Sequence, residues 1–149
     1  HAASAIVGNT VQLRTHPVAL APDTSGTAVT FCEWKTVPTR LQQLYTEYSR
    51  SALPSIMKAL VAYLCFINIH PFADGNGRTS RVLFNALLHA DERQCYIPIK
   101  CAADASDGGY ELRLREAELN ANWVPIMQYI ETIINIQQSN LEALLGIHA

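Results

Sequence analysis

Apolar positions divide the chain into an irregular N-terminal part and a largely helical remainder. After Pro38, apolar side chains recur between residues 41 and 48 at the intervals that line one face of a helix. The same periodicity predicts helices over 55–69, from 76–79 to about 90, over 109–121 and over 123–145, the last ending at Gly146. We expect a short extended connection at Tyr96-Ile97-Pro98-Ile99.

The predicted helix at 55–69 is apolar on almost every face and carries a single charge, at Lys58. A bilayer span requires about 20 apolar residues, so this segment is too short to cross a membrane. A helix that is hydrophobic all round is typical of a protein core. We therefore expect 55–69 to be the central helix of the domain.

Two segments near the N-terminus, 11–14 and 27–31, are rich in β-forming residues. The turn-forming cluster Pro22-Asp23-Thr24-Ser25-Gly26 lies between them. This pattern predicts a small β-hairpin flap at about 11–31. A two-stranded ribbon is marginal alone, so it must pack on the helical core expected at about 40–145.

Composition narrows the class of protein. A chain of 149 residues with 49% hydrophobic and 16% charged residues fits one well-filled globular domain over 1–149. The net charge of −2 supplies no broad basic field, so we expect neither nucleic acid nor membrane among its partners. The four cysteines form no CxxC pair, which argues against structural zinc and suits a cytoplasmic location. Because the chain begins with His1, we expect a fragment of a longer protein.

The stretch HPFADGNGRTSR, residues 70–81, predicts an anion site. Gly75 and Gly77 let the backbone approach a ligand, and the N–H groups that open the next helix cradle phosphate. Arg78 and Arg81 stand one turn apart at a helix start, where cations are disfavoured unless an anion binds there. The nearest acids after Asp74 are Asp91 and Glu92, far along the helix.

Asp74 would repel a phosphate ligand unless a cation lies between them. Mg²⁺ is commonly held by one or two carboxylates together with substrate phosphates, so Asp74 is the candidate metal ligand. His70, one loop away, is the candidate general base. Each residue also has an ordinary interpretation: Asp74 as a helix cap, His70 as a structural histidine, Gly-Asn-Gly as a turn. A calcium loop does not fit, because Arg78 stands where such a loop needs Asp or Asn.

The string resembles the signature of the Fic family, HPFx(D/E)GNGRxxR, and matches every fixed position. Tyr96-Ile97-Pro98-Ile99 and Tyr110-Glu111-Leu112 are similar to the family's usual surroundings, as is the hairpin with Arg14 followed by Trp34-Lys35-Thr36-Val37-Pro38. The resemblance implies an all-α fold, a Fic-type helical core with a small β-hairpin flap. The motif then lies in the loop and helix start between two central helices.

The resemblance also implies a Mg²⁺-dependent protein adenylyltransferase, which moves AMP from ATP to a Ser, Thr or Tyr hydroxyl of a target protein. Carried onto this chain, His70 is the base, Asp74 holds Mg²⁺ and Phe72 anchors the loop. Gly75, Asn76 and Gly77 bind the α- and β-phosphates, the Asn76 side chain included. The roles of Arg78 and Arg81 are to neutralise the outer phosphates.

The implied partner is a target protein docked on the flap by β-strand addition, in the producing cell or in a host cell after secretion. Many relatives carry an inhibitory helix with the pattern (S/T)xxxE(G/N), and no Glu of this chain has Ser or Thr four positions before it. Inhibition then lies outside this fragment, comes from a separate antitoxin-like protein, or is absent.

Two alternatives stay open from the sequence. The first is a transferase of the same fold with another nucleotide or phospho-donor; Gly77 favours AMP, because the phosphate-transferring relatives carry Lys there. The second is a non-catalytic partner-binding module that keeps the nucleotide site for stability.

Overall fold

A computed structural model describes residues 12–22, 25–89 and 96–145. Over these residues the chain is helical, with one antiparallel bridge and no longer strand. It divides into two compact units, His1–Leu88 and His89–Ala149. The elements in chain order are η1 (Trp34–Thr36), α2 (Val37–Arg50), α3 (Ser55–Ile69), α4 (Asn76–His89), α5 (Ile99–Ala105), α6 (Gly109–Asn120) and α7 (Val124–Leu145).

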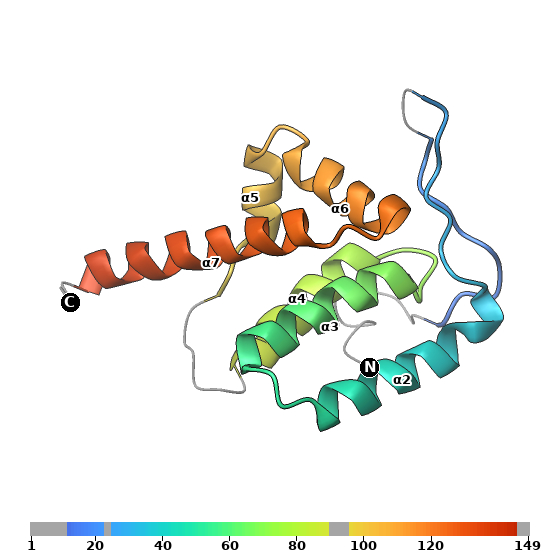
Figure 1. The fold of residues 1–149 in the computed structure, drawn as a ribbon, viewed down its shortest axis with the longest axis horizontal. Helices are drawn as coiled ribbons and strands as arrows, with labels where there is room; N and C mark the ends of the chain where they lie inside the picture. Colours follow the sequence, from blue (N-terminus) through green and yellow to red (C-terminus); the bar gives the residue numbers. More distant parts are fainter. Residues whose placement is uncertain (1–11, 23–24, 90–95, 146–149) are drawn as a thin grey trace. The chain divides into compact units, whose positions relative to one another are not determined.

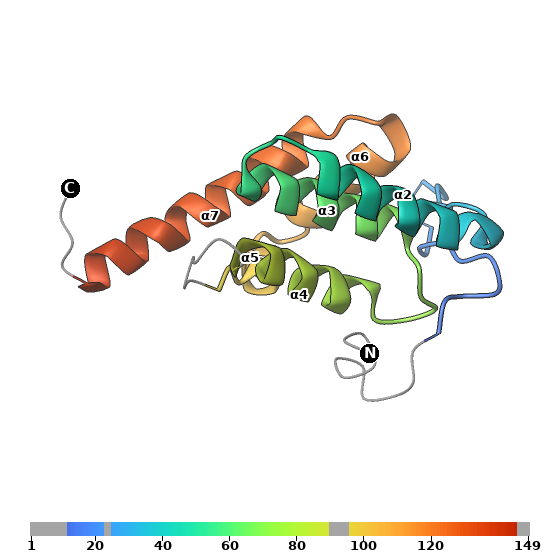
Figure 2. The same ribbon diagram turned by 90° about the horizontal axis from the view of Figure 1, so that it is seen from below.

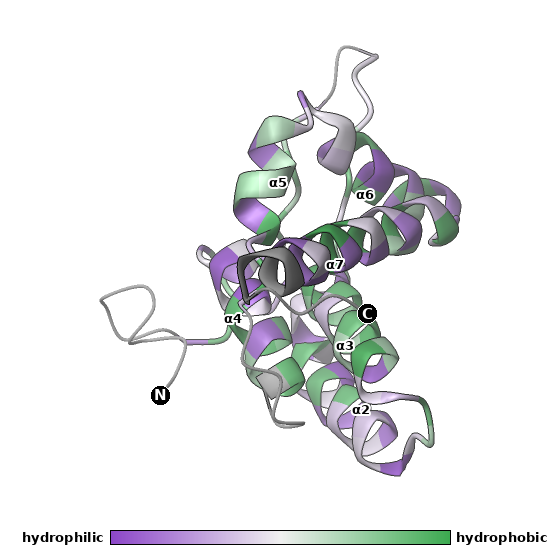
Figure 3. Ribbon diagram, turned by 90° about the vertical axis from the view of Figure 1, so that its left-hand side faces the viewer, coloured by the Kyte–Doolittle hydropathy of each residue, from purple (hydrophilic) through white to green (hydrophobic). Residues whose placement is uncertain are grey.

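Helix α3 is the centre of the first unit, as its apolar sequence predicts. It lies beside α2 on one side and α4 on the other (Figures 1 and 2). The rings of Tyr63 on α3 and Phe84 on α4 are both fully buried, with centroids 5.6 Å apart. Figure 3 shows α3 as mostly hydrophobic, whereas α2 mixes polar and apolar positions because one of its faces is exposed. This packing fixes the two helix ends that flank residues 70–75.

The second unit consists of α5, α6 and α7 (Figure 1). Helices α6 and α7 pack along each other, and α5 contacts both. The hydroxyl of Tyr129 on α7 donates to the carbonyl of Ala102 on α5 at 2.9 Å, and the Tyr110 ring of α6 lies 6.3 Å from the Tyr129 ring. Tyr129 therefore joins all three helices of this unit.

The predicted flap is less regular than expected. Extended residues 18–20 and 29–31 lie side by side, but only Ala19 and Thr30 form a bridge, supported by Leu20 N donating to Val29 O at 2.9 Å. The segment before Pro17 does not continue the ladder, because the backbone N–H of Arg14 instead donates to Pro71 O. The turn at Asp23 and Thr24 lies outside the described residues, as does Val11.

The helix boundaries agree closely with the apolar periodicity, with one exception. Ile99, expected at the end of an extended connection, begins the short helix α5. The predicted stops at Ala90 and Gly146 fall outside the described residues, and a single domain over 1–149 stays a prediction. No helix in the described part of the chain is both long and apolar enough to span a bilayer.

Candidate active site

His70 ends α3 in a left-handed backbone conformation, with φ 51° and ψ 61°. Its backbone N–H still donates to Phe66 O at 3.1 Å, so it caps the helix, and Pro71 then turns the chain away. Non-glycine residues adopt this region at a cost of about 1–2 kcal/mol, and such strain persists only where neighbours enforce it. The candidate base therefore sits on a constrained backbone.

Two residues of the N-terminal segments, Phe31 and Arg14, contact His70. The Phe31 ring stacks on the imidazole at 3.8 Å between centroids and 15° between planes. The imidazole Nδ1 lies 3.3 Å from Ile67 O. Burial lowers the pKa of His70 below 6.5, the hydrogen bond to Ile67 opposes this, and the positive charge of Arg14 lowers the pKa further. The imidazole is therefore neutral at pH 7, the form that can accept a proton.

Arg14 is the residue that the sequence places wrongly. Its similarity to the family put it on the docking flap, but only 4% of it is exposed. Its side chain donates to His70 O at 2.8 Å, Ile69 O at 3.4 Å and Cys32 O at 2.5 Å. The bond to His70 joins residues 56 positions apart, a separation at which sequence carries no periodic signal.

The loop between α3 and α4 is closed by Phe72 and Asn76. The N–H of Phe72 donates to Asn76 Oδ1 at 2.9 Å, and Asn76 Nδ2 donates back to Phe72 O at 2.8 Å. Asn76 is only 3% exposed, and the Phe72 ring lies 6.0 Å from the Phe66 ring on α3. The Asn76 side chain thus holds the loop, and its contact with phosphate stays a prediction.

Helix α4 begins directly after this loop. Gly75 has φ 83°, which favours glycine, and its carbonyl accepts the first helical hydrogen bond from Thr79 N at 2.9 Å. The N–H groups of the first turn, at 76–78, have no intrahelical acceptor, as is general at helix N-termini. Together with the positive end of the helix dipole, they form an anion-binding geometry.

Asp74 and Arg78 form an ion pair that the sequence analysis overlooked. Arg78 Nη2 lies 3.1 Å from Asp74 Oδ2, while Asp74 Oδ1 accepts the Gly75 N–H at 2.6 Å. The Asp74 side chain is 83% exposed, so solvent screens the pair and it contributes about 0–1 kcal/mol. Arg78 therefore has an acidic neighbour one turn earlier, and a ligand can displace this weak partner.

Arg81 lies over the first turn of α4. Its Nη1 atom is 3.3 Å from the place where a Cβ on residue 77 would stand. Because Gly77 has no side chain, the Arg81 guanidinium has room to fold back toward the start of α4. No hydrogen bond or ion pair of this guanidinium is found with the described residues, which leaves it available for an anion.

The donor set allows a magnesium ion but not an all-protein metal centre. In the described ranges, no three or more His, Cys, Asp or Glu side chains come together. Asp74 offers one exposed carboxylate beside an anion-binding helix start. A single carboxylate supplemented by phosphate oxygens is a usual arrangement for Mg²⁺, so the residues fit this ion.

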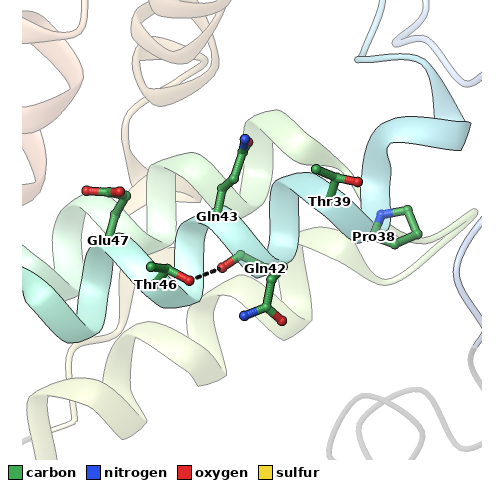
Figure 4. A pocket seen from close by; sticks show the side chains of 6 residues that line it. All are labelled: Pro38, Thr39, Gln42, Gln43, Thr46 and Glu47. Carbon is green, nitrogen blue, oxygen red and sulfur yellow. Dashed lines mark hydrogen bonds between the residues drawn. The ribbon is translucent and has the colours of Figure 1, made fainter.

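A separate shallow pocket lies on the exposed face of α2 (Figure 4). Its lining side chains all belong to this one helix: Pro38, Thr39, Gln42, Gln43, Thr46 and Glu47. Figure 4 shows them projecting from consecutive turns, with Thr46 bonded to the Gln42 carbonyl. None of them is a residue of the 70–81 stretch, so this pocket is not part of the candidate site.

Known proteins resemble both the sequence and the fold. A 45-residue stretch is 53% identical to the protein adenylyltransferase Fic of Drosophila willistoni; it makes up 30% of this chain and 9% of that relative. A Fic family protein from Desulfovibrio desulfuricans matches 93% of the chain at a TM-score of 0.80 and 18% identity, over 42% of its own length. The Bartonella tribocorum effector BepC, whose structure contains AMPPNP, matches 82% of the chain and 63% of its own length at a TM-score of 0.56 and 18% identity.

The curated relative thus shares only a small part of its length with this chain, and the structural matches establish the fold. The family model for Fic/DOC proteins matches residues 2–88, more than half of the chain and nearly the whole of the first compact unit. That unit contains every residue of the candidate site. The chain belongs to the Fic/DOC family.

Proposed function

We propose that this protein transfers AMP from ATP to a hydroxyl group of a target protein and releases pyrophosphate. The observation that carries the proposal is the arrangement of a neutral, half-buried His70 one closed loop before the open N-terminus of α4. A proton acceptor and an anion cradle are the two parts that hydroxyl attack on a phosphate requires. The adenylyltransferase name of the Drosophila relative and the AMPPNP bound to BepC support this choice.

In the proposed reaction, the target hydroxyl oxygen forms a bond to the α-phosphorus of ATP, and the bond from that phosphorus to the pyrophosphate oxygen breaks. His70 accepts the hydroxyl proton. The backbone N–H groups of 75–77 bind phosphate oxygens, that of Gly75 after Asp74 Oδ1 has released it. The Arg78 and Arg81 guanidinium groups offset the remaining negative charge. In this scheme Asn76 contributes its backbone N–H, while its side chain holds the loop to Phe72.

Asp74 would hold Mg²⁺ when ATP is bound, and the ion would supply charge neutralisation at the phosphates. Arg78 then exchanges its exposed partner Asp74 for a phosphate group. The exchange costs little, because the ion pair it breaks is weak. The two residues therefore restrain each other before the nucleotide arrives and separate afterwards.

We further propose that the target binds along the extended segments 18–20 and 29–31. A single bridge, between Ala19 and Thr30, joins these segments. Phe31, which follows Thr30, stacks on the His70 ring. A target strand added here would bring its hydroxyl group toward the base through main-chain hydrogen bonds. A separate inhibitory protein of the antitoxin type is a second proposed partner.

The test uses the purified chain with Mg²⁺ and candidate lysates, in parallel reactions with ATP labelled on the α- or the γ-phosphate. Label transferred only from the α-position, and lost in His70→Ala, is the expected result. Calorimetry should show that the His70→Ala protein still binds ATP, because the phosphate cradle is intact. A base of this kind contributes about 10²–10⁴-fold to the rate.

Other outcomes point to the alternatives. Label from the γ-position alone would identify a phosphate transferase of the same fold. ATP binding without transfer in any lysate would favour a partner-binding module. Transfer at an undiminished rate by His70→Ala would exclude His70 as the base.

A further inference from the structure

Arg14 is a buried cation that binds main-chain oxygen atoms. Its side-chain nitrogens donate to four carbonyls, those of His16, Cys32, Ile69 and His70, and one nitrogen also lies 3.6 Å from Cys32 Sγ. No carboxylate pairs with it in the described part of the chain. A buried charge without a counterion is costly, so stability alone is a poor explanation for an arginine here.

The bonds of Arg14 converge on the end of α3. Its Nε and Nη2 atoms donate to the carbonyls of His70 and Ile69, and its backbone N–H donates to Pro71 O at 2.9 Å. Three successive carbonyls around the left-handed residue are therefore held by one amino acid. The Nη1 atom donates to His16 O and Nη2 donates also to Cys32 O, which connects this end of α3 to both N-terminal segments.

We propose that Arg14 is the positioning residue for His70, fixing the peptide groups on either side of it and thereby the direction of its imidazole. The inference rests on the proposed function, in which His70 takes the hydroxyl proton. Only a planar guanidinium offers several rigid donors in one plane. Lysine would keep the positive charge but would lose that fork.

The electrostatic surroundings agree with this role. Arg14 and burial both lower the pKa of His70, which keeps the imidazole neutral. The Cys32 thiol lies against the Arg14 guanidinium, which meets His16 only at its backbone carbonyl, while the uncharged Phe31 ring covers one face of the His70 imidazole. Arg14 therefore acts through two separable properties: its charge, and the geometry of its donors.

The experiment compares Arg14→Lys and Arg14→Met with Arg40→Met, which alters an exposed arginine on α2. Three quantities are measured on the 149-residue chain: the maximal AMP-transfer rate, the ATP dissociation constant by calorimetry, and the pH titration of the His70 imidazole by NMR, assigned with His70→Ala. A misplaced catalytic group costs about 10²-fold. We expect the rate to fall about 10–100-fold in both Arg14 variants, with ATP affinity unchanged within about twofold.

The titration separates charge from geometry. The His70 pKa should rise in Arg14→Met, where the positive charge is removed, and stay near the wild-type value in Arg14→Lys. Arg40→Met should leave all three quantities unchanged. Wild-type rates in a folded Arg14→Lys protein would overturn the proposal, as would a loss of ATP affinity that accounts for the whole rate effect.

The result also distinguishes this inference from the proposed function. If the wild-type chain transfers no AMP, the proposed function fails, but the NMR signals of His70 still report its environment. Unchanged His70 shifts and pKa in Arg14→Met would then overturn the positioning role. If Arg14→Met does not fold, Arg14→Lys decides; if neither variant folds, Arg14 is a structural residue and the inference is wrong.

Discussion

Asn76 and Phe72 are bonded to each other in both directions, the Phe72 N–H to Asn76 Oδ1 at 2.9 Å and Asn76 Nδ2 to the Phe72 carbonyl at 2.8 Å. Because the amide is buried, Asn76→Ala would leave two backbone groups without their partners. We expect the free energy of unfolding to fall by about 1–3 kcal/mol and the transfer rate to fall with it. Thermal unfolding and single-turnover transfer measure the two effects. Asn140→Ala, on the exposed face of α7, is the control; an equal loss there would contradict the assignment.

Asp74→Asn should separate metal binding from stability. The ion pair with Arg78 is exposed, so the loss of unfolding free energy should stay below about 1 kcal/mol. ATP affinity measured with Mg²⁺ and with EDTA should differ in the wild type and become nearly equal in the variant, because the proposed metal carboxylate is gone. A variant that keeps the full Mg²⁺ dependence would remove Asp74 from the metal site.

Gly77→Ala should raise stability and lower activity at the same time. Alanine is favoured over glycine in a helix by up to about 1 kcal/mol, but its Cβ would meet Arg81 Nη1 at 3.3 Å. The displaced guanidinium should weaken ATP binding, which calorimetry measures. Gly109→Ala is a matched control, because its Cβ would push the Arg113 guanidinium on α6, outside the candidate site. Equal ATP affinity in the two variants would argue against an anion-binding role for Arg81.

The acid limb of the transfer rate should be centred below pH 6.5. The pKa of His70 is lowered by burial and by Arg14, so more than half of the imidazole is neutral at the pH where an ordinary histidine is half protonated. The rate should then fall about tenfold per pH unit below the lowered pKa, because only the neutral base accepts a proton. A pH–rate profile with its acid limb centred at or above 6.5 would refute the neutral-base assignment.

Glu118 on α6 should make stability depend on pH. Both of its carboxylate oxygens are buried without a hydrogen bond from the described residues, and burial raises its pKa to about 7 against the opposing charge of Arg115. Between pH 4.5 and 7 the folded chain binds more protons at this site than the unfolded chain, so the stability contributed by Glu118 falls as pH rises.

Glu118→Gln should therefore stabilise the protein at pH 8, by about 1–2 kcal/mol after allowance for solvent screening. The gain should vanish near pH 5, where the native carboxyl is already neutral. Denaturant unfolding at both pH values measures the difference, with Glu131→Gln on the exposed face of α7 as the control. A gain that does not change with pH would contradict the raised pKa.

Most of the helices could be predicted because periodicity is a local property. The limits of α3 and the start of α4 follow from their apolar spacing and from the glycines on either side of Asn76. The short helix α5 could not, because its seven residues are fewer than the window that periodicity needs, and Ile97 and Ile99 suggest an extended segment. The predicted flap is more regular than the observed one, which has a single bridge, because β-propensity does not reveal that Arg14 bonds to the motif loop.

The motif itself could be located from sequence, but the way its residues hold one another could not. The Asp74–Arg78 pair follows from i, i+4 spacing and could have been anticipated. The stack of Phe31 on His70 and the bonds of Arg14 depend on tertiary contact between distant segments. The hold of the Asn76 side chain on Phe72 could not be predicted either, because a sequence does not say which backbone groups an amide meets in its own loop.

The 56-residue separation of Arg14 and His70 also affects how the site forms. Closing a flexible chain segment of this length costs roughly 3–4 kcal/mol of entropy, and that cost is met only when the first unit has folded. The motif helix can form locally, whereas the base is held only by long-range contact. Gentle heating or low denaturant should therefore disengage the base while helical structure persists, so the catalytic competence of the protein follows its tertiary folding rather than its helix content.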